Sequence, residues 1–299
     1  MLMNLQTKLL ISVAWLVPAL VLGADSATPA KIASPYKTDH KAPLDAKVEL
    51  IEKKETHSIW RVEFNGIAGD RVPGNLYLPA KIEGRRPAVL VQHGIGDRKT
   101  AEYITSSCRF FAELGVIALA IDAPNRGERL DNNRKVDLTN IPAVHDWFRQ
   151  HCGDYSRAYD YLESRADVDR GRLGYMGFSW GAITGVTYVA HDPRVSCMAS
   201  IVGGGNLVGY LGLPGKGGAG TSLDPAHHVA AIAPRPLLMV NGRRDIVILP
   251  MFAKALHQAA GEGSKVIWHD TDHVFSGVDR PTILLSVCEF VRDHLPKKP

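Results

Sequence analysis

The stretch Gly177-Phe178-Ser179-Trp180-Gly181 decides how the rest of this chain is interpreted. A short apolar run, residues 172–176, precedes it and fits a buried strand, and residues 182–190 follow it with the length of a helix. Gly-x-Ser-x-Gly between a strand and a helix is typical of a very tight turn, in which the residues two before and two after the serine crowd each other. We therefore expect Ser179 to hold a strained backbone, with its hydroxyl raised above the sheet edge at a helix N-terminus.

The bulk composition is that of an ordinary globular protein. The 299 residues suffice for one large α/β domain or two small ones, and the contents of 45% hydrophobic and 22% charged residues are unremarkable for that class. The net charge of +4 comes from 35 basic and 31 acidic residues without a dense Lys/Arg block. We therefore exclude nucleic acid as a partner.

Residues 1–24 have the features of a secretory signal peptide. Lys8 supplies a positive charge, and the apolar run Leu9 to Leu22 is followed by small and then polar residues. The run is short for a spanning helix and contains Pro18, so we expect cleavage without stable membrane insertion, with a retained anchor as the alternative. Residues 25–45 lack periodicity and are predicted to form a flexible leader. The mature protein is expected to be secreted or periplasmic.

Four cysteines would permit two disulfides in an oxidising compartment, with three pairings. Most lie in apolar helix or strand settings, so buried free thiols are the other interpretation. Cys152 alone has a histidine beside it, but adjacent side chains on a helix point apart, which gives a cysteine nucleophile little support. The four are Cys108, Cys152, Cys197 and Cys288.

The remaining pattern predicts an α/β domain over residues 46–299. Residues 47–53, 59–64 and 72–78 fit strands with connections too short for helical crossovers, so we expect an antiparallel opening. From Pro87 onward apolar strands alternate with helices, which indicates a mostly parallel sheet covered on both faces. The later strands are expected at 88–92, 116–121, 172–176, 195–202, 236–240 and 265–268, and the helices at 100–114, 142–163, 182–190, 250–260 and 281–295.

Glycine is very dense over residues 203–220, with a few large apolar residues between. Because this segment follows the strand next to the serine turn, we expect either a small mobile cap over the site or a disordered surface loop.

A serine hydroxyl needs a histidine to accept its proton and a carboxylate to orient that histidine. Asp245 follows the strand predicted at 236–240, and His273 follows the strand predicted at 265–268. Ligands of parallel sheets bind at the carboxyl ends of the strands, so Ser179, Asp245 and His273 are the predicted catalytic residues.

Competing assignments remain at each of these positions. Asp245 could instead be a loop carboxylate paired with Arg243 or Arg244, and His269 competes with His273 as the base. A metal held by the two histidines would require a helix, whereas this stretch has the pattern of a strand and a loop. His227-His228 are adjacent, so their side chains point apart and we interpret them as structural.

An oxyanion formed by attack on a carbonyl needs two fixed donors. The amide of Trp180, directly after the serine, is one. The other is expected from the loop after the first parallel strand, where Gly94 allows close approach and the Ile95 amide is our choice. His93 is expected to be a buried structural histidine.

These motifs resemble those of α/β-hydrolases, closest to the dienelactone hydrolase-like and acetyl xylan esterase-like branch. The matching residues, within roughly residues 45–296, are His93-Gly94-Ile95-Gly96, Asp122 with Arg126-Gly127-Glu128, Val168-Asp169, Arg172-Leu173, the serine turn, Asp245 and His273. Dienelactone hydrolases proper carry a cysteine where this chain has Ser179, so that particular activity is not expected.

The resemblance implies a serine hydrolase that cleaves small-molecule or carbohydrate-linked carboxylic esters through an acyl-enzyme, without a metal or organic cofactor. We expect short acyl groups, because glycine-rich backbone is poor at lining a deep apolar tunnel. Asn125, Arg126, Glu128 and Arg129 could meet a polar leaving group, or could form a solvated salt-bridged loop. The rival interpretations are a prolyl oligopeptidase-like peptidase, which usually needs a large additional domain, and a catalytically silent binding module.

Overall fold

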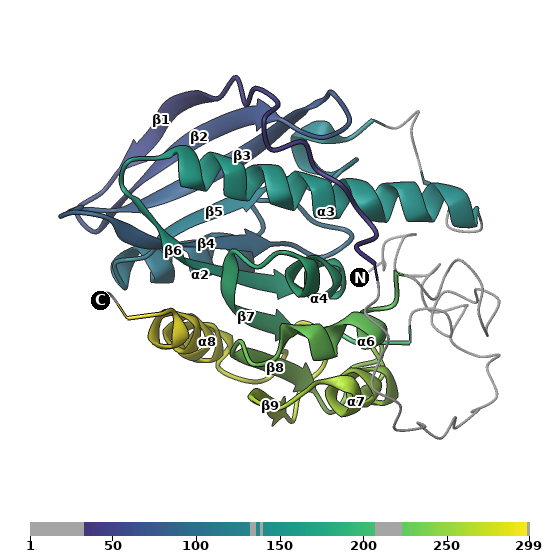
Figure 1. The fold of residues 1–299 in the computed structure, drawn as a ribbon. Coiled ribbons are helices and arrows are strands. Elements are labelled where there is room, and N and C mark those ends of the chain that lie inside the picture. The colour runs from purple at the N-terminus through teal and green to yellow at the C-terminus, as the bar shows by residue number, and fades with distance from the viewer. Residues whose placement is uncertain (1–32, 132–135, 138–139, 207–222, 298–299) are drawn as a thin grey trace, which may run out of the picture.

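The computed structural model describes residues 33–131, 136–137, 140–206 and 223–297, and Figure 1 shows a central sheet between layers of helices. Within these residues nine strands form one sheet in the order β1-β2-β3-β5-β4-β6-β7-β8-β9. Every predicted strand is present, although several begin or end a few residues away from the expected position. The strands are β1 (Lys47–Lys53), β2 (His57–Asn65), β3 (Arg71–Pro79), β4 (Arg86–Gln92), β5 (Ile117–Ile121), β6 (Val168–Phe178), β7 (Val195–Ile201), β8 (Leu237–Gly242) and β9 (Ser264–His269).

Strand pairing changes once across the sheet, from antiparallel to parallel. β1, β2 and β3 pair antiparallel with one another, and β3 pairs antiparallel with β5. From β5 through β4 to β9 every pair is parallel. This confirms the predicted fold, and it places the carboxyl ends of six strands, β4 to β9, along one edge of the sheet.

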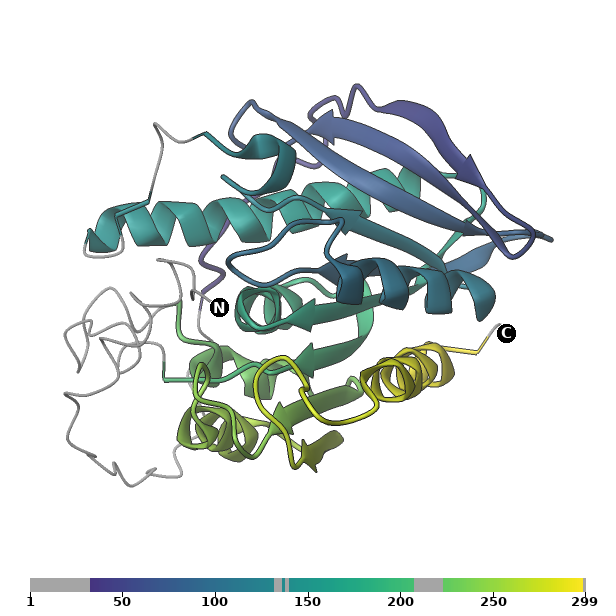
Figure 2. The ribbon, with the colours of Figure 1, turned by 180° about the vertical axis from the view of Figure 1, so that it is seen from behind.

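Helices cover both faces of the sheet and create two apolar cores (Figures 1 and 2). Along β4, Leu90 packs in one core and its neighbours Val89 and Val91 in the other, as expected for a strand buried on both faces. One face carries α3 (Ile141–Ser164), α4 (Trp180–His191), α6 (Pro225–His228), η3 (Val229–Ile232) and α7 (Pro250–Ala259); the other carries α2 (Glu102–Glu113) and α8 (Arg280–His294).

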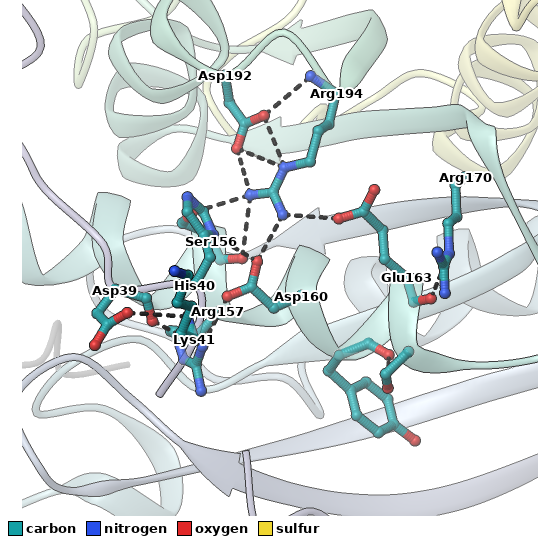
Figure 3. A network of polar contacts seen from close by, with 12 residues as sticks. Asp39, His40, Lys41, Ser156, Arg157, Asp160, Glu163, Arg170, Asp192 and Arg194 are labelled. Atoms are coloured by element: carbon teal, nitrogen blue, oxygen red, sulfur yellow. Dashed lines mark hydrogen bonds and ion pairs between the residues drawn. The ribbon is translucent and has the colours of Figure 1, made fainter. Parts of the chain in front are cut away.

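Residues 33–45, which we call the N-terminal strap, lie against α3 and α4. The buried Arg157 guanidinium of α3 donates hydrogen bonds to three strap carbonyls, those of Asp39, Ala42 and Pro43, at 3.2, 2.7 and 3.1 Å. Figure 3 shows Arg157 beside Asp39. The Tyr36 hydroxyl donates to the carbonyl of Tyr188 on α4 at 3.3 Å. These contacts differ from the expected flexible leader, because a buried guanidinium needs acceptors and the strap supplies them.

A cavity of about 670 Å³ lies between the strap, α3 and the loop after α4. Its charged lining is a network in which Arg194 pairs with Asp160, Glu163 and Asp192 at 2.6, 3.0 and 2.6 Å (Figure 3). The 12 residues of α4 separate this loop from Ser179 by about 18 Å of helix. The cavity is therefore not part of the predicted catalytic edge.

Several expectations fall partly outside the described residues. The signal peptide lies there entirely, as does the glycine-dense segment beyond Asn206. The three described glycines of this segment, residues 203–205, are closely packed; a Cβ on Gly204, for example, would lie 2.8 Å from the Ile248 side chain. All four cysteines are free and buried, as the second interpretation of them predicts. In the described part of the chain, no helix combines the length and apolar character needed to span a membrane.

Candidate active site

Ser179 occupies the turn between β6 and α4, at the carboxyl edge of the sheet. Its φ of 49° and ψ of −112° lie in a region that costs a non-glycine residue about 1–3 kcal/mol. A Cβ on Gly177 would lie 2.4 Å from the Gly181 carbonyl oxygen, and a Cβ on Gly181 would lie 2.8 Å from that of Gln92. The backbone thus leaves no room for a side chain at either glycine, and the predicted strained serine turn is confirmed.

Asp245 and His273 come together from the loops after β8 and β9. The Asp245 side chain is 1% exposed, and its Oδ2 lies 2.7 Å from Nδ1 of His273. Its Oδ1 accepts the backbone N–H groups of Val247 and Ile248 at 2.8 and 2.9 Å. A carboxylate held at both oxygens keeps the histidine proton on Nδ1 and leaves Nε2 as the proton acceptor.

The rival partners of this pair are engaged elsewhere. Arg244 pairs with the exposed Asp270 at 3.1 Å rather than with Asp245. The His269 ring packs near Phe275, with centroids 6.0 Å apart, and burial lowers its pKa. The structure therefore joins Asp245 to His273, and not to Arg244 or His269.

Asp272 has a role that the sequence did not reveal. Its Oδ1 accepts the N–H groups of Val274 and Ser276 at 3.1 and 2.9 Å, and these bonds lower its pKa. Because His273 lies inside this turn, Asp272 shapes the loop that presents the imidazole.

The two amides predicted to bind an oxyanion flank the serine turn. A Cβ on Gly94 would lie 3.4 Å from the Ser179 Cβ, so the Gly94–Ile95 segment lies beside the serine. The Gly94 N–H donates to the Tyr103 hydroxyl at 3.0 Å, a contact that no sequence motif signals. The Trp180 amide belongs to the first turn of α4, where N–H groups have no partner within the helix.

His93 is a buried structural histidine, as predicted. Its Nδ1 lies 2.8 Å from the Gly94 carbonyl oxygen, and its Nε2 accepts the Ala123 N–H at 3.1 Å. These contacts require a neutral ring with its proton on Nδ1, and burial lowers its pKa accordingly. His93 thus ties the loop after β4 to the loop after β5.

The loop after β5 is organised around the buried Asp122, whose carboxylate accepts the Lys99 backbone N–H at 2.8 Å and Nζ at 2.6 Å. Glu128, in η1 (Gly127–Arg129), contacts the same Lys99 Nζ and donates its N–H to Asp122 at 3.0 Å. The Arg129 side chain, 5% exposed, pairs with Asp70 and Asp154 at 2.5 and 2.8 Å.

Ion pairs thus engage both Glu128 and Arg129, which favours the salt-bridged alternative over contact with a leaving group. The loop after β5 is salt-bridged, as that alternative predicts, but the side chains of Lys99, Asp122 and Arg129 are buried rather than solvated. Arg126 also turns inward, since its Nε donates to the Ile95 carbonyl and its Nη1 donates to the Asn125 carbonyl at 2.7 Å.

The aromatic side chains of Trp147 and His151 on α3 pack against the Trp180 side chain. The rings of Trp147 and Trp180 stack with centroids 5.1 Å apart. Trp180 Nε1 donates to Nε2 of His151 at 3.3 Å, and His151 Nδ1 lies 2.7 Å from the Trp147 carbonyl oxygen. Burial lowers the pKa of His151 to about 3, so this ring is neutral. Burial also raises the pKa of the Cys152 thiol, which disfavours a thiolate there.

His228, one of the two adjacent histidines, contacts another histidine. Nδ1 of His228 lies 2.9 Å from Nε2 of His191, a contact between α6 and α4 that fits the structural interpretation. Across the described ranges, no group of three or more His, Cys, Asp or Glu side chains could hold a metal ion.

A family model and several curated proteins match this chain. The model of the Dienelactone hydrolase family matches residues 72–283. The chain is 26% identical over 226 residues to "Putative hydrolase YtaP" of Bacillus subtilis (strain 168), covering 69% of this chain and 76% of that protein. It is 29% identical over 167 residues to "Uncharacterized protein PA2218" of Pseudomonas aeruginosa, covering 54% of this chain and only 39% of that protein.

Solved structures share the architecture at low sequence identity. An acetyl xylan esterase from Paenibacillus sp. R4 is 20% identical with a TM-score of 0.70, over 86% of this chain and 90% of that one. A cold-adapted esterase from an Arctic intertidal metagenomic library is 19% identical with a TM-score of 0.65, over 85% of this chain and 99% of that one. These likenesses show the α/β-hydrolase fold.

Proposed function

Because this chain belongs to the dienelactone hydrolase family, we propose that it is a serine esterase that works through an acyl-enzyme. The observation that carries the proposal is the contact of 2.7 Å between Asp245 and His273, at the sheet edge that presents the strained Ser179. Nucleophile, acid and base follow the chain order Ser, Asp, His of the α/β-hydrolase fold.

The proposed reaction has two halves, formation of the acyl-enzyme and its hydrolysis, and the same residues act in both. Ser179 Oγ attacks the ester carbonyl carbon while His273 Nε2 takes the hydroxyl proton, and Asp245 stabilises the imidazolium. The N–H groups of Ile95 and Trp180 hold the negative oxygen of the tetrahedral intermediate. His273 then gives the proton to the departing alcohol. In the second half, His273 Nε2 takes a proton from water while the water oxygen attacks the acyl carbon. Collapse of this intermediate returns the proton to Ser179 Oγ and releases the acid.

Replacement of the nucleophile tests this proposal. Ser179→Ala should reduce ester hydrolysis by several orders of magnitude without loss of fold, because it removes the atom that forms the covalent bond. A fluorophosphonate should label the wild type at Ser179. The variant Ser106→Ala, at a half-buried serine of α2 whose hydroxyl donates to Glu102, should be labelled and active like the wild type. Labelling that persists in Ser179→Ala would refute the nucleophile. Turnover of aminoacyl amides in place of esters would favour the peptidase alternative.

We further propose short acyl groups, acetyl to butyryl, on a moderately polar or aromatic alcohol of a small molecule or sugar. The described glycines 203–205 support this, because they pack closely against β7, α4, α6, α7 and Ile248 and add no apolar side chain to a pocket wall. The test is kcat/KM across p-nitrophenyl acetate, butyrate, octanoate and palmitate. We expect the maximum at acetate or butyrate, and a maximum at octanoate or longer would contradict it.

Export is proposed from the sequence of residues 1–24, with its charged start and apolar run. The N-terminal residue of the protein recovered outside the cytoplasm should lie near Asp25. Recovery of intact chains in the cytoplasm would contradict export.

A further inference from the structure

The carbonyl of Gly94 and the carbonyl of Ile95 are held by two different side chains. The Gly94 carbonyl oxygen, which belongs to the same peptide group as the Ile95 N–H, accepts a hydrogen bond from His93 Nδ1 at 2.8 Å. The Ile95 carbonyl accepts a hydrogen bond from Arg126 Nε. A trans peptide is planar, and its C=O and N–H point in opposite directions. The bond to the Gly94 carbonyl therefore fixes the direction of the Ile95 N–H, and the bond from Arg126 fixes the next peptide plane, on the other side of Ile95.

Arg126 also reaches the second amide, through aromatic rings. Its guanidinium lies over the Trp147 ring at 5.4 Å, and Trp147 stacks on Trp180 with centroids 5.1 Å apart and an interplanar angle of 18°. The Trp147 indole is itself anchored, since Nε1 donates to the Pro124 carbonyl at 3.1 Å. The stack thus runs from the loop after β5, across α3, to the first residue of α4.

His151 locks the far end of this stack. It accepts from Trp180 Nε1 at 3.3 Å through Nε2, while its Nδ1 contacts the Trp147 carbonyl at 2.7 Å. The two indoles are therefore held by hydrogen bonds as well as by stacking.

We infer that Arg126 is a positioning residue for both oxyanion-binding amides: its hydrogen bond to the Ile95 carbonyl holds the backbone that carries the Ile95 N–H, and its contact with Trp147 supports Trp180. The inference rests on the proposed function, because it assigns a role to these amides in ester hydrolysis. Donors at an oxyanion act only at the correct distance and angle, so a small displacement lowers the rate without weakening substrate binding.

The orientation of Arg126 supports this role over a role in binding the leaving group. Its Nε and Nη1 are used by carbonyl oxygens of the protein, and one face of its guanidinium is covered by an indole. A planar guanidinium can donate in its plane and stack on a ring at once, which a lysine ammonium cannot do.

The test compares Arg126→Met and Arg126→Lys with Arg98→Gln. Arg98 is an exposed arginine on the loop after β4 whose Nε contacts Thr100, so its replacement removes a nearby charge without touching Ile95. Each variant is assayed for kcat and KM with p-nitrophenyl acetate, for thermal unfolding, and for inhibition by a trifluoromethyl ketone. That ketone forms a tetrahedral oxyanion adduct with a serine, so its Ki reports on the oxyanion site and does not depend on the fraction of folded enzyme.

We expect Arg126→Met to lower kcat by about 10²-fold with KM unchanged, and to raise the ketone Ki by the same factor by which kcat/KM falls. The kcat and the ketone Ki of Arg126→Lys should lie between those of Arg126→Met and the wild type. The lysine variant also provides the test if Arg126→Met fails to fold. Arg98→Gln should match the wild type. Trp147→Leu should show the same signature, and combining it with Arg126→Met should cost less than the product of the two single effects.

Two sets of results would overturn the inference while leaving the proposed function intact. One is an unchanged ketone Ki in both Arg126 variants, with any lost activity explained by a lower unfolding temperature. The other is strictly multiplicative effects of Arg126→Met and Trp147→Leu. The proposed function is judged separately, by wild-type hydrolysis and by the labelling of Ser179.

Discussion

Asp245 divides its two carboxylate oxygens between two tasks. Oδ1 is held by the amides of Val247 and Ile248, and Oδ2 faces His273 at 2.7 Å. The backbone bonds fix the carboxylate in space, and the second oxygen then fixes the tautomer and the direction of the imidazole. Asp270, which lies close to His273 in sequence, is exposed and paired with Arg244, so it can perform neither task.

Asp245→Asn should therefore lower kcat by up to about 10⁴-fold, as expected when an amide leaves the histidine in the wrong tautomer. Asp270→Asn is the matched control and should retain nearly full activity. The measurement is kcat with p-nitrophenyl acetate for both variants. If Asp270→Asn were the crippling change, the carboxylate would be wrongly assigned.

At the scale of elements, one buried side chain, Arg157, makes several of the contacts between the strap and α3. Arg157 is 2% exposed and also donates to the Asn65 carbonyl at 3.3 Å and pairs with Asp160 at 2.8 Å. It therefore joins the strap to α3 and to the end of β2. A cation buried to this degree is stable only while all of these acceptors remain in place.

Arg157→Met should lower the free energy of unfolding by about 3 kcal/mol, because it leaves Asp160 without this partner and the strap carbonyls without their donor. Arg292→Met, which removes an exposed pair with Asp293 on α8, should change it by less than about 1 kcal/mol. Chemical denaturation measures both. Equal effects would show that the strap contributes no more than a surface ion pair.

At the scale of the whole molecule, desolvation disfavours the charged form of several histidines, of which His151 is buried and His191 and His257 are half-buried. Burial lowers the pKa of His151 to about 3 and the pKa values of His191 and His257 to about 4. In the unfolded chain these rings take up protons below about pH 6.5, whereas in the folded protein they resist protonation. Stability is therefore highest above about pH 6.5 and falls as the pH drops toward the folded pKa values.

His151→Gln should flatten this dependence. One proton fewer taken up on unfolding reduces the slope of unfolding free energy by about 1.4 kcal/mol per pH unit between about pH 4 and 6. The exposed His294→Gln variant at the end of α8 should keep the wild-type slope. Denaturation curves across this pH range measure both, and identical slopes for wild type and His151→Gln would show that His151 takes up its proton without unfolding.

Much of the architecture was predictable from local pattern. The alternation of apolar strands and helices follows from burial on both faces, and the short connections before β4 require antiparallel pairing. The serine turn was equally predictable from its Gly-x-Ser-x-Gly pattern, since Gly177 is crowded by Gly181 of the same turn; the crowding of Gly181 by Gln92 of β4 is a tertiary contact. The strap was not, because its contacts come from a guanidinium more than a hundred residues later in the chain.

By itself, then, the sequence determined the sheet, the strained Ser179 and the set of polar residues at the ends of its strands. It selected His273 without excluding His269, and only the tertiary structure decided the contacts: His273 beside Asp245, Arg126 on the Ile95 carbonyl, and Trp147 with His151 beside Trp180. The physical reason is range. Periodicity and turn chemistry act over a few residues, whereas partners of buried polar groups are selected by the packing of elements that are distant in sequence.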